Sequence, residues 1–205
     1  MATRILLVRH GQSEWNASGR WQGWAESDLS DLGRQQAFEA AAAIGSVDAI
    51  VASDLQRALQ TALIISEAIG VGPVLTNADL RERDVGEWTG LTRDEIEARW
   101  PGDLDRWRSG ELLCPPGGEQ NDHIVERVER GLRAIGVECD GGEVLAVSHG
   151  GVMRLLERHH GVEQPPVFTN LGGLVVDVHD GRITVGERVQ LLDPSTDHVT
   201  APPNL

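Results

Sequence analysis

Two short apolar runs in this chain are each followed by a polar residue, a histidine and a glycine. Residues 5–8 (ILLV) lead into Arg9-His10-Gly11, and residues 144–147 (VLAV) lead into Ser148-His149-Gly150. Each run has the length and composition of a buried strand in a parallel sheet. Proteins with such sheets keep their chemistry at the carboxyl ends of the strands. Both histidines are therefore expected at one sheet edge, where the arginine and backbone amides suit an anionic group.

A third apolar run, residues 49–52 (AIVA), leads into Ser53 and Asp54. Either residue is a suitable N-cap for a following helix, which would place Arg57 in its first turn. The guanidinium group of Arg57 is then expected to face the same edge as the two histidines. Because parallel strands end on one side of a sheet, residues about 140 positions apart in the chain meet there.

Helical patterns separate these strand candidates and define the fold class. Helices are expected over about 31–44, 55–69, 93–100, 122–135 and 152–158, with Ser30 or Asp31 capping the first helix and Thr92 with Glu95 forming a capping box. Further strands are expected at 73–75 and in a hairpin of 174–176 and 182–189. This alternation predicts a three-layer α/β/α sandwich around a mostly parallel sheet. Since no linker divides the chain, one domain over residues 1–205 is expected, with an irregular tail at 193–205.

Composition excludes several classes of function. The formal net charge of -14 disfavours nucleic acid and anionic membranes as partners. All 18 basic residues are arginines, so mechanisms that need a lysine base, Schiff base or Walker motif are excluded. Cys114 and Cys139 are in no metal-binding or disulfide pattern, so no metal site is expected. With no apolar stretch of membrane-spanning length and no secretory leader pattern, we expect a cytoplasmic protein.

Two histidines, two arginines and one carboxyl group at one cleft favour phosphoryl transfer through a histidine. A neutral imidazole nitrogen attacks phosphorus while arginines neutralise the phosphoryl oxygens. The leaving oxygen also needs a proton, which a carboxyl group held protonated by apolar or anionic surroundings can supply. Glu82 is the leading candidate for this acid, with Asp84, Glu87 and Glu119 as competitors that the sequence alone does not rank.

The order of the motifs resembles that of a known family. The relevant motifs are RHGQSEWN at residues 9–16, GRWQG at 19–23, DLS at 28–30, SDLQRA at 53–58, LRE at 80–82, PGGE at 116–119 and VSHGG at 147–151. Together they resemble the signature of the histidine phosphatase superfamily, the phosphoglycerate-mutase-like proteins, over roughly residues 4 to 155. The resemblance implies a phosphoglycerate-mutase-like fold and a small phosphorylated substrate, with no metal and no cofactor.

The resemblance also assigns roles to individual residues. It implies that His10 is the nucleophile that becomes phosphohistidine, that Arg9, Arg57 and His149 hold the phosphoryl oxygens, and that Glu82 donates and accepts the proton. Residues implied to bind substrate are Asn16, Gln22, Gly23 and Gly150. Two structural alternatives stay open, namely an Asx-type turn cap for Asn16 and a salt bridge of Glu82 with Arg81 or Arg83.

Two activities share this signature, and the sequence favours hydrolysis. Cofactor-dependent phosphoglycerate mutases carry a tyrosine where this chain has Val85, and a pair of arginines where it has Arg108-Ser109. They also have a long insert after the proline-rich loop, whereas here only Gln120-Asn121 separates Glu119 from the next predicted helix. A mutase must shield phosphohistidine from water, so a short lid favours a phosphomonoesterase. The mutase is the alternative, and a non-catalytic anion-binding domain is a remote one.

Two further expectations concern partners. Arg93, Arg106 and Arg108 are candidates for reading an acidic group on the substrate, although solvated helix faces explain them equally well. Base rates for enzymes of this size favour a homodimer.

Overall fold

A six-stranded sheet forms the centre of the computed structural model, which describes residues 1–195. The strand order is β3-β2-β4-β1-β5-β6, and the strands are β1 (Thr3–Arg9), β2 (Ala49–Ala52), β3 (Val74–Thr76), β4 (Glu143–Ser148), β5 (Gly172–His179) and β6 (Arg182–Gln190). Strands β3, β2, β4 and β1 are parallel, whereas β5 runs antiparallel to both of its neighbours. The predicted mostly parallel sheet and the closing hairpin are confirmed.

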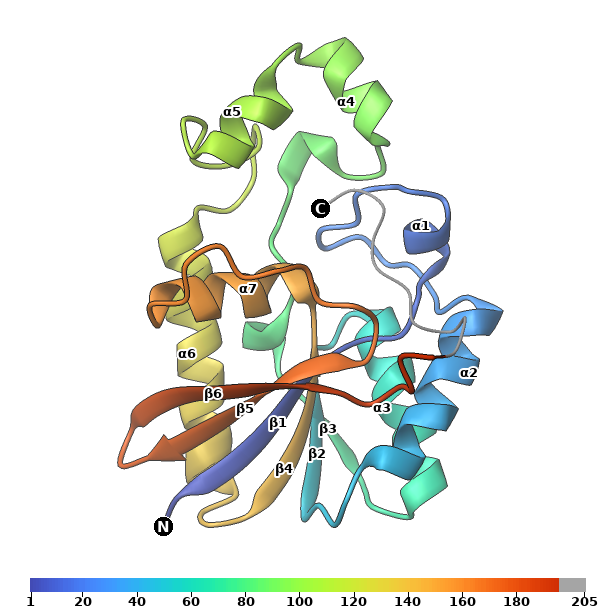
Figure 1. Ribbon diagram of the computed structural model, residues 1–205, viewed down its shortest axis with the longest axis vertical. Helices are drawn as coiled ribbons and strands as arrows, with labels where there is room; N and C mark the ends of the chain where they lie inside the picture. The colour runs from blue at the N-terminus through green and yellow to red at the C-terminus, as the bar shows by residue number, and fades with distance from the viewer. Residues whose placement is uncertain (196–205) are drawn as a thin grey trace.

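Helices cover both faces of this sheet (Figure 1). Helix α2 (Asp31–Ala40) and helix α3 (Gln56–Ile69) pack on one face, while α6 (Asn121–Glu138) and α7 (Gly150–His159) pack on the other. The three-layer sandwich predicted from the alternating pattern is therefore confirmed. The shorter helices are α1 (Glu14–Ala17), α4 (Arg93–Arg99) and α5 (Asp103–Ser109).

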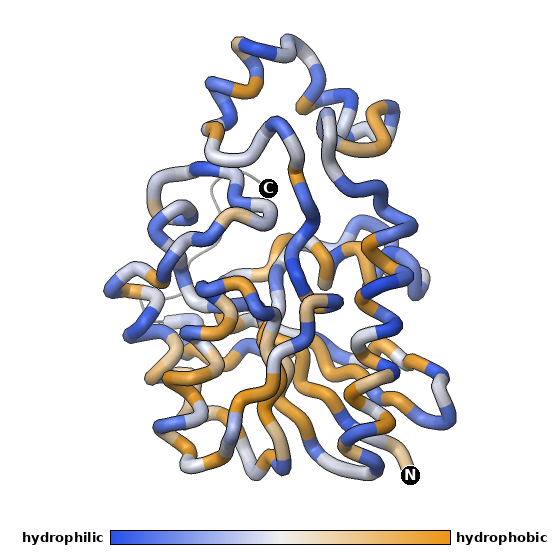
Figure 2. Tube along the Cα trace, turned by 180° about the vertical axis from the view of Figure 1, so that it is seen from behind, coloured by the Kyte–Doolittle hydropathy of each residue, from blue (hydrophilic) through white to orange (hydrophobic). Residues whose placement is uncertain are grey.

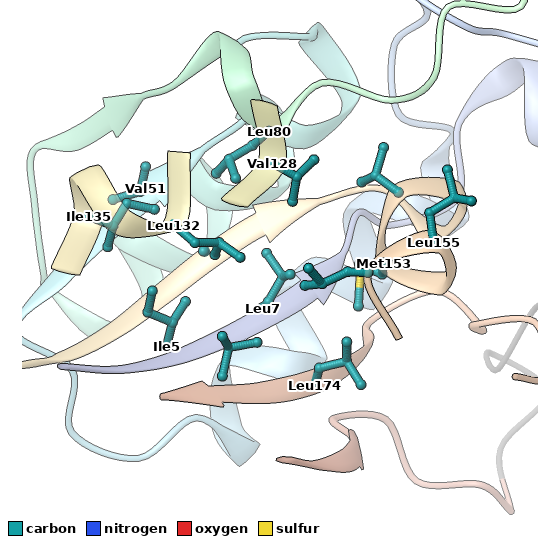
Figure 3. Packing of buried hydrophobic residues seen from close by; sticks show 14 of the residues in the cluster. Ile5, Leu7, Val51, Leu80, Val128, Leu132, Ile135, Met153, Leu155 and Leu174 are labelled. Atoms are coloured by element: carbon teal, nitrogen blue, oxygen red, sulfur yellow. The ribbon is translucent and has the colours of Figure 1, made fainter. Parts of the chain in front are cut away.

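The two faces of β1 show why the sheet needs both helical layers. Successive side chains of a strand point to opposite faces. Ile5 and Leu7 pack with Leu132 of α6 and Met153 of α7 (Figure 3), whereas Val8 belongs to the core under α2 and α3. Figure 2 shows the strands as a hydrophobic centre within a largely hydrophilic outer trace. Burial on both faces explains the nearly continuous apolar runs of the sequence.

A third apolar cluster lies beyond the carboxyl ends of the strands, under helices α4 and α5 at the top of Figure 1. Its centre is formed by Trp21, Trp88 and Trp107, whose rings meet edge to face at centroid distances of 5.3 to 5.9 Å. Aromatic rings prefer this geometry. The cluster fixes a small helical cap above the end of the sheet, and α1 and α5 in this region were not predicted.

The caps of the helices test the sequence predictions individually. Ser30 caps α2, and the capping box of Thr92 and Glu95 opens α4, as predicted. The prediction that Ser53 or Asp54 caps α3 was wrong, because Leu55 occupies the N-cap position without a side-chain hydrogen bond. The side chain of Ser53 contacts His149, and that of Asp54 pairs with Arg81. Within residues 1–195, no helix is long and apolar enough to cross a membrane. Of the tail predicted from 193, residues 193–195 are irregular and the others lie outside the described residues.

We expect Gly33→Ala to destabilise the fold, because the new methyl group would overlap the backbone carbonyl of Gln12. This contact seats the segment after β1 on α2. Overpacking of this kind costs about 1–3 kcal/mol, which urea unfolding can measure. Gly45→Ala is the matched control, since nothing lies within 4 Å of its added carbon. Equal stabilities of the two variants would contradict the close approach.

Candidate active site

A cavity of about 940 Å³ opens at the carboxyl ends of the parallel strands, under the helical cap. Eight of the nine residues predicted from the sequence line it: Arg9, His10, Asn16, Gln22, Gly23, Arg57, Glu82 and Gly150. The ninth, His149, is fully buried directly behind His10, with the two ring centroids 5.1 Å apart. The structure thus brings all nine predicted residues together.

The protonation of His10 follows from its hydrogen bond. Its Nδ1 atom lies 2.5 Å from the backbone carbonyl oxygen of Gly11. A carbonyl oxygen only accepts hydrogen bonds, so Nδ1 must carry a proton. In the neutral ring, Nε2 then holds a free lone pair. Asn170 fixes the same segment by donating a 2.8 Å hydrogen bond to the carbonyl oxygen of His10.

Both central imidazoles are disfavoured as cations. Burial, and then the charges of Arg57 and Arg9, lower the pKa of His10 well below 6.5. Burial, then Arg57 and His10, likewise lower the pKa of His149. Taking a charged imidazolium out of water and placing it beside guanidinium groups is unfavourable. Both rings are therefore neutral at neutral pH.

Ser53 links β2 to His149. Its hydroxyl oxygen lies 2.9 Å from Nε2 of His149 and accepts a 3.4 Å hydrogen bond from the backbone N–H of Leu55. Because the Leu55 N–H occupies one lone pair of the hydroxyl oxygen, we assign the hydroxyl hydrogen to Nε2, and in this assignment the neutral ring carries its proton on Nδ1. That Nδ1 atom is buried without a partner in the described chain. It is thus a donor held ready for an additional acceptor.

Arg9 and Arg57 are cations held in place by backbone carbonyl groups. Arg9 donates to the carbonyl oxygen of Phe168 at 2.8 Å, and Arg57 donates to the carbonyl oxygens of Gly23 at 2.8 Å and Ala25 at 3.1 Å. Burial lowers the pKa of each arginine to about 10, so both stay charged at neutral pH. The buried Nε of Arg57 has no partner among the described residues. The cavity therefore contains fixed, incompletely satisfied positive charge, which suits an anion.

Glu82 is the only one of the four candidate acids that lines the cavity. Its carboxylate accepts hydrogen bonds from the backbone N–H of Arg83 at 2.8 Å and of Gly151, in the first turn of α7, at 3.1 Å. The apolar or anionic surroundings expected for this acid are absent from the described structure, because Arg9, Arg57 and Arg83 all interact electrostatically with it. The alternative salt bridge with Arg81 is also absent there, since Arg81 pairs with Asp54.

The competing acids have structural partners. Glu119 forms an ion pair with Arg127 at 2.7 Å, and Asp84 accepts from the backbone N–H of Gly86 at 2.9 Å. Glu87 does not line the cavity. The structure thus ranks the four carboxylates, which the sequence does not.

The remaining predicted residues form the wall of the cavity near Arg9. Asn16 is the N3 residue of the capping box that opens α1, since its side chain accepts from the backbone N–H of Ser13 at 3.3 Å, and it also accepts from Nη2 of Arg9 at 3.3 Å. The structural role is thus a helix capping box and not the Asx-type turn considered from the sequence. Gln22 accepts a 2.8 Å hydrogen bond from the hydroxyl of Ser13. These contacts orient Arg9 and the loop that carries Gly23.

Of the three arginines considered for reading an acidic group on the substrate, one lies at the cavity. Arg108 lines the cavity, but Arg93 and Arg106 do not, and Arg106 pairs with Asp103. Four further arginines line the cavity that were not predicted from the sequence, namely Arg20, Arg83, Arg154 and Arg158. The spacing of Arg154 and Arg158 by four residues on a predicted helix was the available signal. No cluster of side chains within residues 1–195 is suited to hold a metal ion.

The fold and the site together define an α/β protein with a buried, arginine-lined pocket around a neutral histidine. The model of the histidine phosphatase superfamily (branch 1) matches residues 5–180, and the chain belongs to this family. The resemblance inferred from the motifs is thereby confirmed.

Comparisons with individual proteins agree with this assignment. The chain is 39% identical over 159 residues to a metal-independent phosphoserine phosphatase of Arabidopsis thaliana, covering 75% of this chain and 67% of that protein. It is 38% identical over 162 residues to a glucosyl-3-phosphoglycerate phosphatase of Mycolicibacterium vanbaalenii, covering 75% and 72%. A solved structure of a mycobacterial glucosyl-3-phosphoglycerate phosphatase with inorganic phosphate superposes with a TM-score of 0.78 at 31% identity, covering 92% of this chain and 98% of that chain.

We predict that stability falls as the pH drops from about 6.5 towards 5. The pKa values of His10 and His149 are lowered by folding, so below 6.5 the unfolded chain binds protons that the folded protein does not. Each histidine then costs up to about 1.4 kcal/mol per pH unit. Urea unfolding measures this slope, and His10→Gln should reduce it. A pH-independent free energy of unfolding over this range would contradict buried neutral rings.

We predict that Ser53→Ala changes the tautomer of His149. Without the hydroxyl group, Nε2 of His149 loses its hydrogen-bond donor, so the ring proton is no longer held on Nδ1. The nitrogen NMR shifts of the ring report this change directly. The lost buried hydrogen bond also costs about 1 kcal/mol of stability. Ser46→Ala, at an exposed position, is the control. An unchanged His149 spectrum in Ser53→Ala would rule out the positioning role of Ser53.

Proposed function

We propose that this protein is a metal-independent phosphomonoesterase that hydrolyses a small phosphorylated metabolite through a phosphohistidine intermediate on His10. The observation that carries this proposal is the hydrogen bond from Nδ1 of His10 to the carbonyl oxygen of Gly11. It leaves the Nε2 lone pair available, in a ring whose pKa is too low for protonation at neutral pH. A neutral, oriented imidazole is a competent nucleophile towards phosphorus.

The buried donors are matched to a phosphoryl group. Arg9 and Arg57 carry the positive charge that offsets the charge on the phosphoryl oxygens, and Nδ1 of His149 with Nε of Arg57 are donors without partners among the described residues. Preorganised donors of this kind stabilise a charged transition state because they do not have to reorient. The carboxyl group of Glu82 lines the same cavity and is the candidate for the proton transfer.

The proposed reaction has two transfers. In the first, Nε2 of His10 forms a bond to phosphorus, the ester P–O bond breaks, and the leaving oxygen takes a proton from Glu82. In the second, a water oxygen forms a bond to phosphorus and gives its proton to the Glu82 carboxylate, while the P–N bond breaks. Inorganic phosphate leaves, and both His10 and Glu82 return to their starting states.

Hydrolysis is favoured over the mutase alternative by the loop that follows the proline-rich segment. Helix α6 begins at Asn121, so only Gln120 separates it from Glu119. A segment this short provides no lid to exclude water, and water competes for the phosphohistidine. The substrates named for the two relatives, phosphoserine and glucosyl-3-phosphoglycerate, are the first compounds to test.

We predict that the wild type releases phosphate from one or more phosphorylated metabolites in the presence of a chelator, and that His10→Ala abolishes this release. Glu82→Gln should lower kcat by about a hundredfold, because the amide cannot donate a proton to the leaving oxygen. A labelled phosphoryl group from the substrate, found on His10 after quenching and removed by acid, would identify the phosphohistidine intermediate. Phosphate release that persists in His10→Ala would refute the proposal.

A second assay separates the phosphatase from the mutase. The wild type, primed with a bisphosphoglycerate, should interconvert 3- and 2-phosphoglycerate only poorly. Efficient interconversion would instead establish the mutase.

A further inference from the structure

The cavity holds far more positive charge than one phosphoryl group needs. Two carboxylates line it, those of Glu82 and Glu163, against seven arginines: Arg9, Arg20, Arg57, Arg83, Arg108, Arg154 and Arg158. Two of these arginines have a carboxylate within 4 Å that balances their charge: Arg20 pairs with Glu95, and Arg108 pairs with Asp105. This excess stands out in a chain whose formal net charge is -14.

Three of these arginines form a group outside the contacts of Arg9 and Arg57. No carboxylate of residues 1–195 pairs within 4 Å with Arg83, Arg154 or Arg158. Burial lowers the pKa of Arg83 and Arg154, and repulsion by Arg158 lowers both further, whereas the more distant attraction of Glu82 and Glu119 raises that of Arg83 and the attraction of Glu157 raises that of Arg154. Like charges brought together without a carboxylate in contact are destabilising. Their persistence at one cavity wall points to an anion that belongs there.

Arg83 gives this group a fixed centre. Its side chain is 8% exposed, and its guanidinium carbon lies 5.1 Å from the ring centroid of Trp107. Its Nη1 atom is buried and has no hydrogen-bond partner in the described structure. An unpartnered buried donor costs free energy unless a ligand satisfies it. Stacking on an indole ring holds the guanidinium plane in position.

Helix α7 sets the distance between this arginine group and the phosphoryl site. Gly150 begins the helix at the phosphoryl end, and Arg154 and Arg158 follow on one face. At 1.5 Å per residue, their Cα atoms lie about 6 Å and about 12 Å further along the axis. Apolar side chains line the same cavity, among them those of Val85, Leu112 and Leu155. A ligand that spans both regions therefore needs a spacer with apolar surface.

We infer that the substrate carries a second anionic group, one to two helical turns from its phosphomonoester, and that Arg83, Arg154 and Arg158 bind it. This inference rests on the proposed phosphatase function and narrows its substrate class to phosphomonoesters with a distal carboxylate or second phosphate. The arginines contribute binding and specificity, while the transfer chemistry stays with His10 and Glu82. A guanidinium group recognises both kinds of anion through the same paired N–H donors.

Three aryl phosphates of equal spacer length test this inference: 4-carboxyphenyl phosphate, its neutral isostere 4-carbamoylphenyl phosphate, and 1,4-phenylene bisphosphate. The wild type, assayed in chelator, should favour one of the anionic probes over the neutral probe by at least about tenfold in kcat/KM, mainly through KM. Whichever anionic probe is preferred identifies the group as carboxylate or phosphate.

Substitution of the arginines should remove this preference. Arg158→Met, at an exposed position, and Arg154→Met should each lower the preference several-fold, with a much smaller change for the neutral probe. Arg34→Met is the matched control, because Arg34 is exposed on α2 and does not line the cavity. Its preference should equal that of the wild type. Urea unfolding of each variant verifies that it is folded.

The possible failures differ from one another. Equal hydrolysis of all three probes would overturn the anionic subsite. A preference for the anionic probes that survives in the double variant Arg154→Met/Arg158→Met would also overturn it. Either result would leave the proposed phosphatase function unaffected. Absence of hydrolysis with every probe and with every metabolite of the panel would remove the proposed function, and this inference with it.

Discussion

Two buried guanidinium groups, those of Arg9 and Arg57, set the conditions for everything around them. Backbone carbonyl oxygens hold them in place, and no carboxylate of the described chain pairs with either. Glu82 attracts both guanidinium groups without pairing with either within 4 Å, so their burial is costly and a ligand that supplies negative charge offsets the cost. Burial, and then the same cations, lower the pKa of His10 and His149. The two arginines therefore contribute both to the suitability of the cavity for an anion and to the neutral state of His10.

The fold makes this arrangement possible by directing the parallel strands to one edge. Arg9 ends β1, Ser148 ends β4, and Ser53 directly follows β2, so that residues far apart in the chain become neighbours. The approach of Gly11 and Gly33, where any side chain would collide with backbone, presses the segment after β1 against α2. The core on both faces of the sheet holds these strand ends in place, so the site is carried by closely packed strands.

Sequence patterns predicted the sheet and the central residues because both depend on local signals. Apolar runs that end in His-Gly mark the positions of His10 and His149 without any knowledge of packing. The role of Ser53 could not be predicted this way: it resembles a helix cap, and only the placement of β4 beside β2 shows that it contacts His149. The residues alone did not rank Glu82 above Glu119; the family resemblance favoured Glu82, and in the structure Glu119 pairs with Arg127. The spacing of Arg154 and Arg158 is a local signal, but the presence of Arg83 at the same cavity depends on tertiary packing, which no local pattern encodes.

The charge distribution imposes a selection that neither the cavity nor the surface would produce alone. A chain with a formal net charge of -14 repels anions at a distance, but at physiological ionic strength that repulsion is screened beyond about 8 Å. Inside the cavity the arginines act at contact distance and in a lower dielectric, where their attraction dominates. A large polyanion stays outside the cavity and is repelled by the acidic surface. A small anion enters the cavity, where the guanidinium groups attract it. The acidic exterior and the basic interior together favour small anions over large polyanions as ligands.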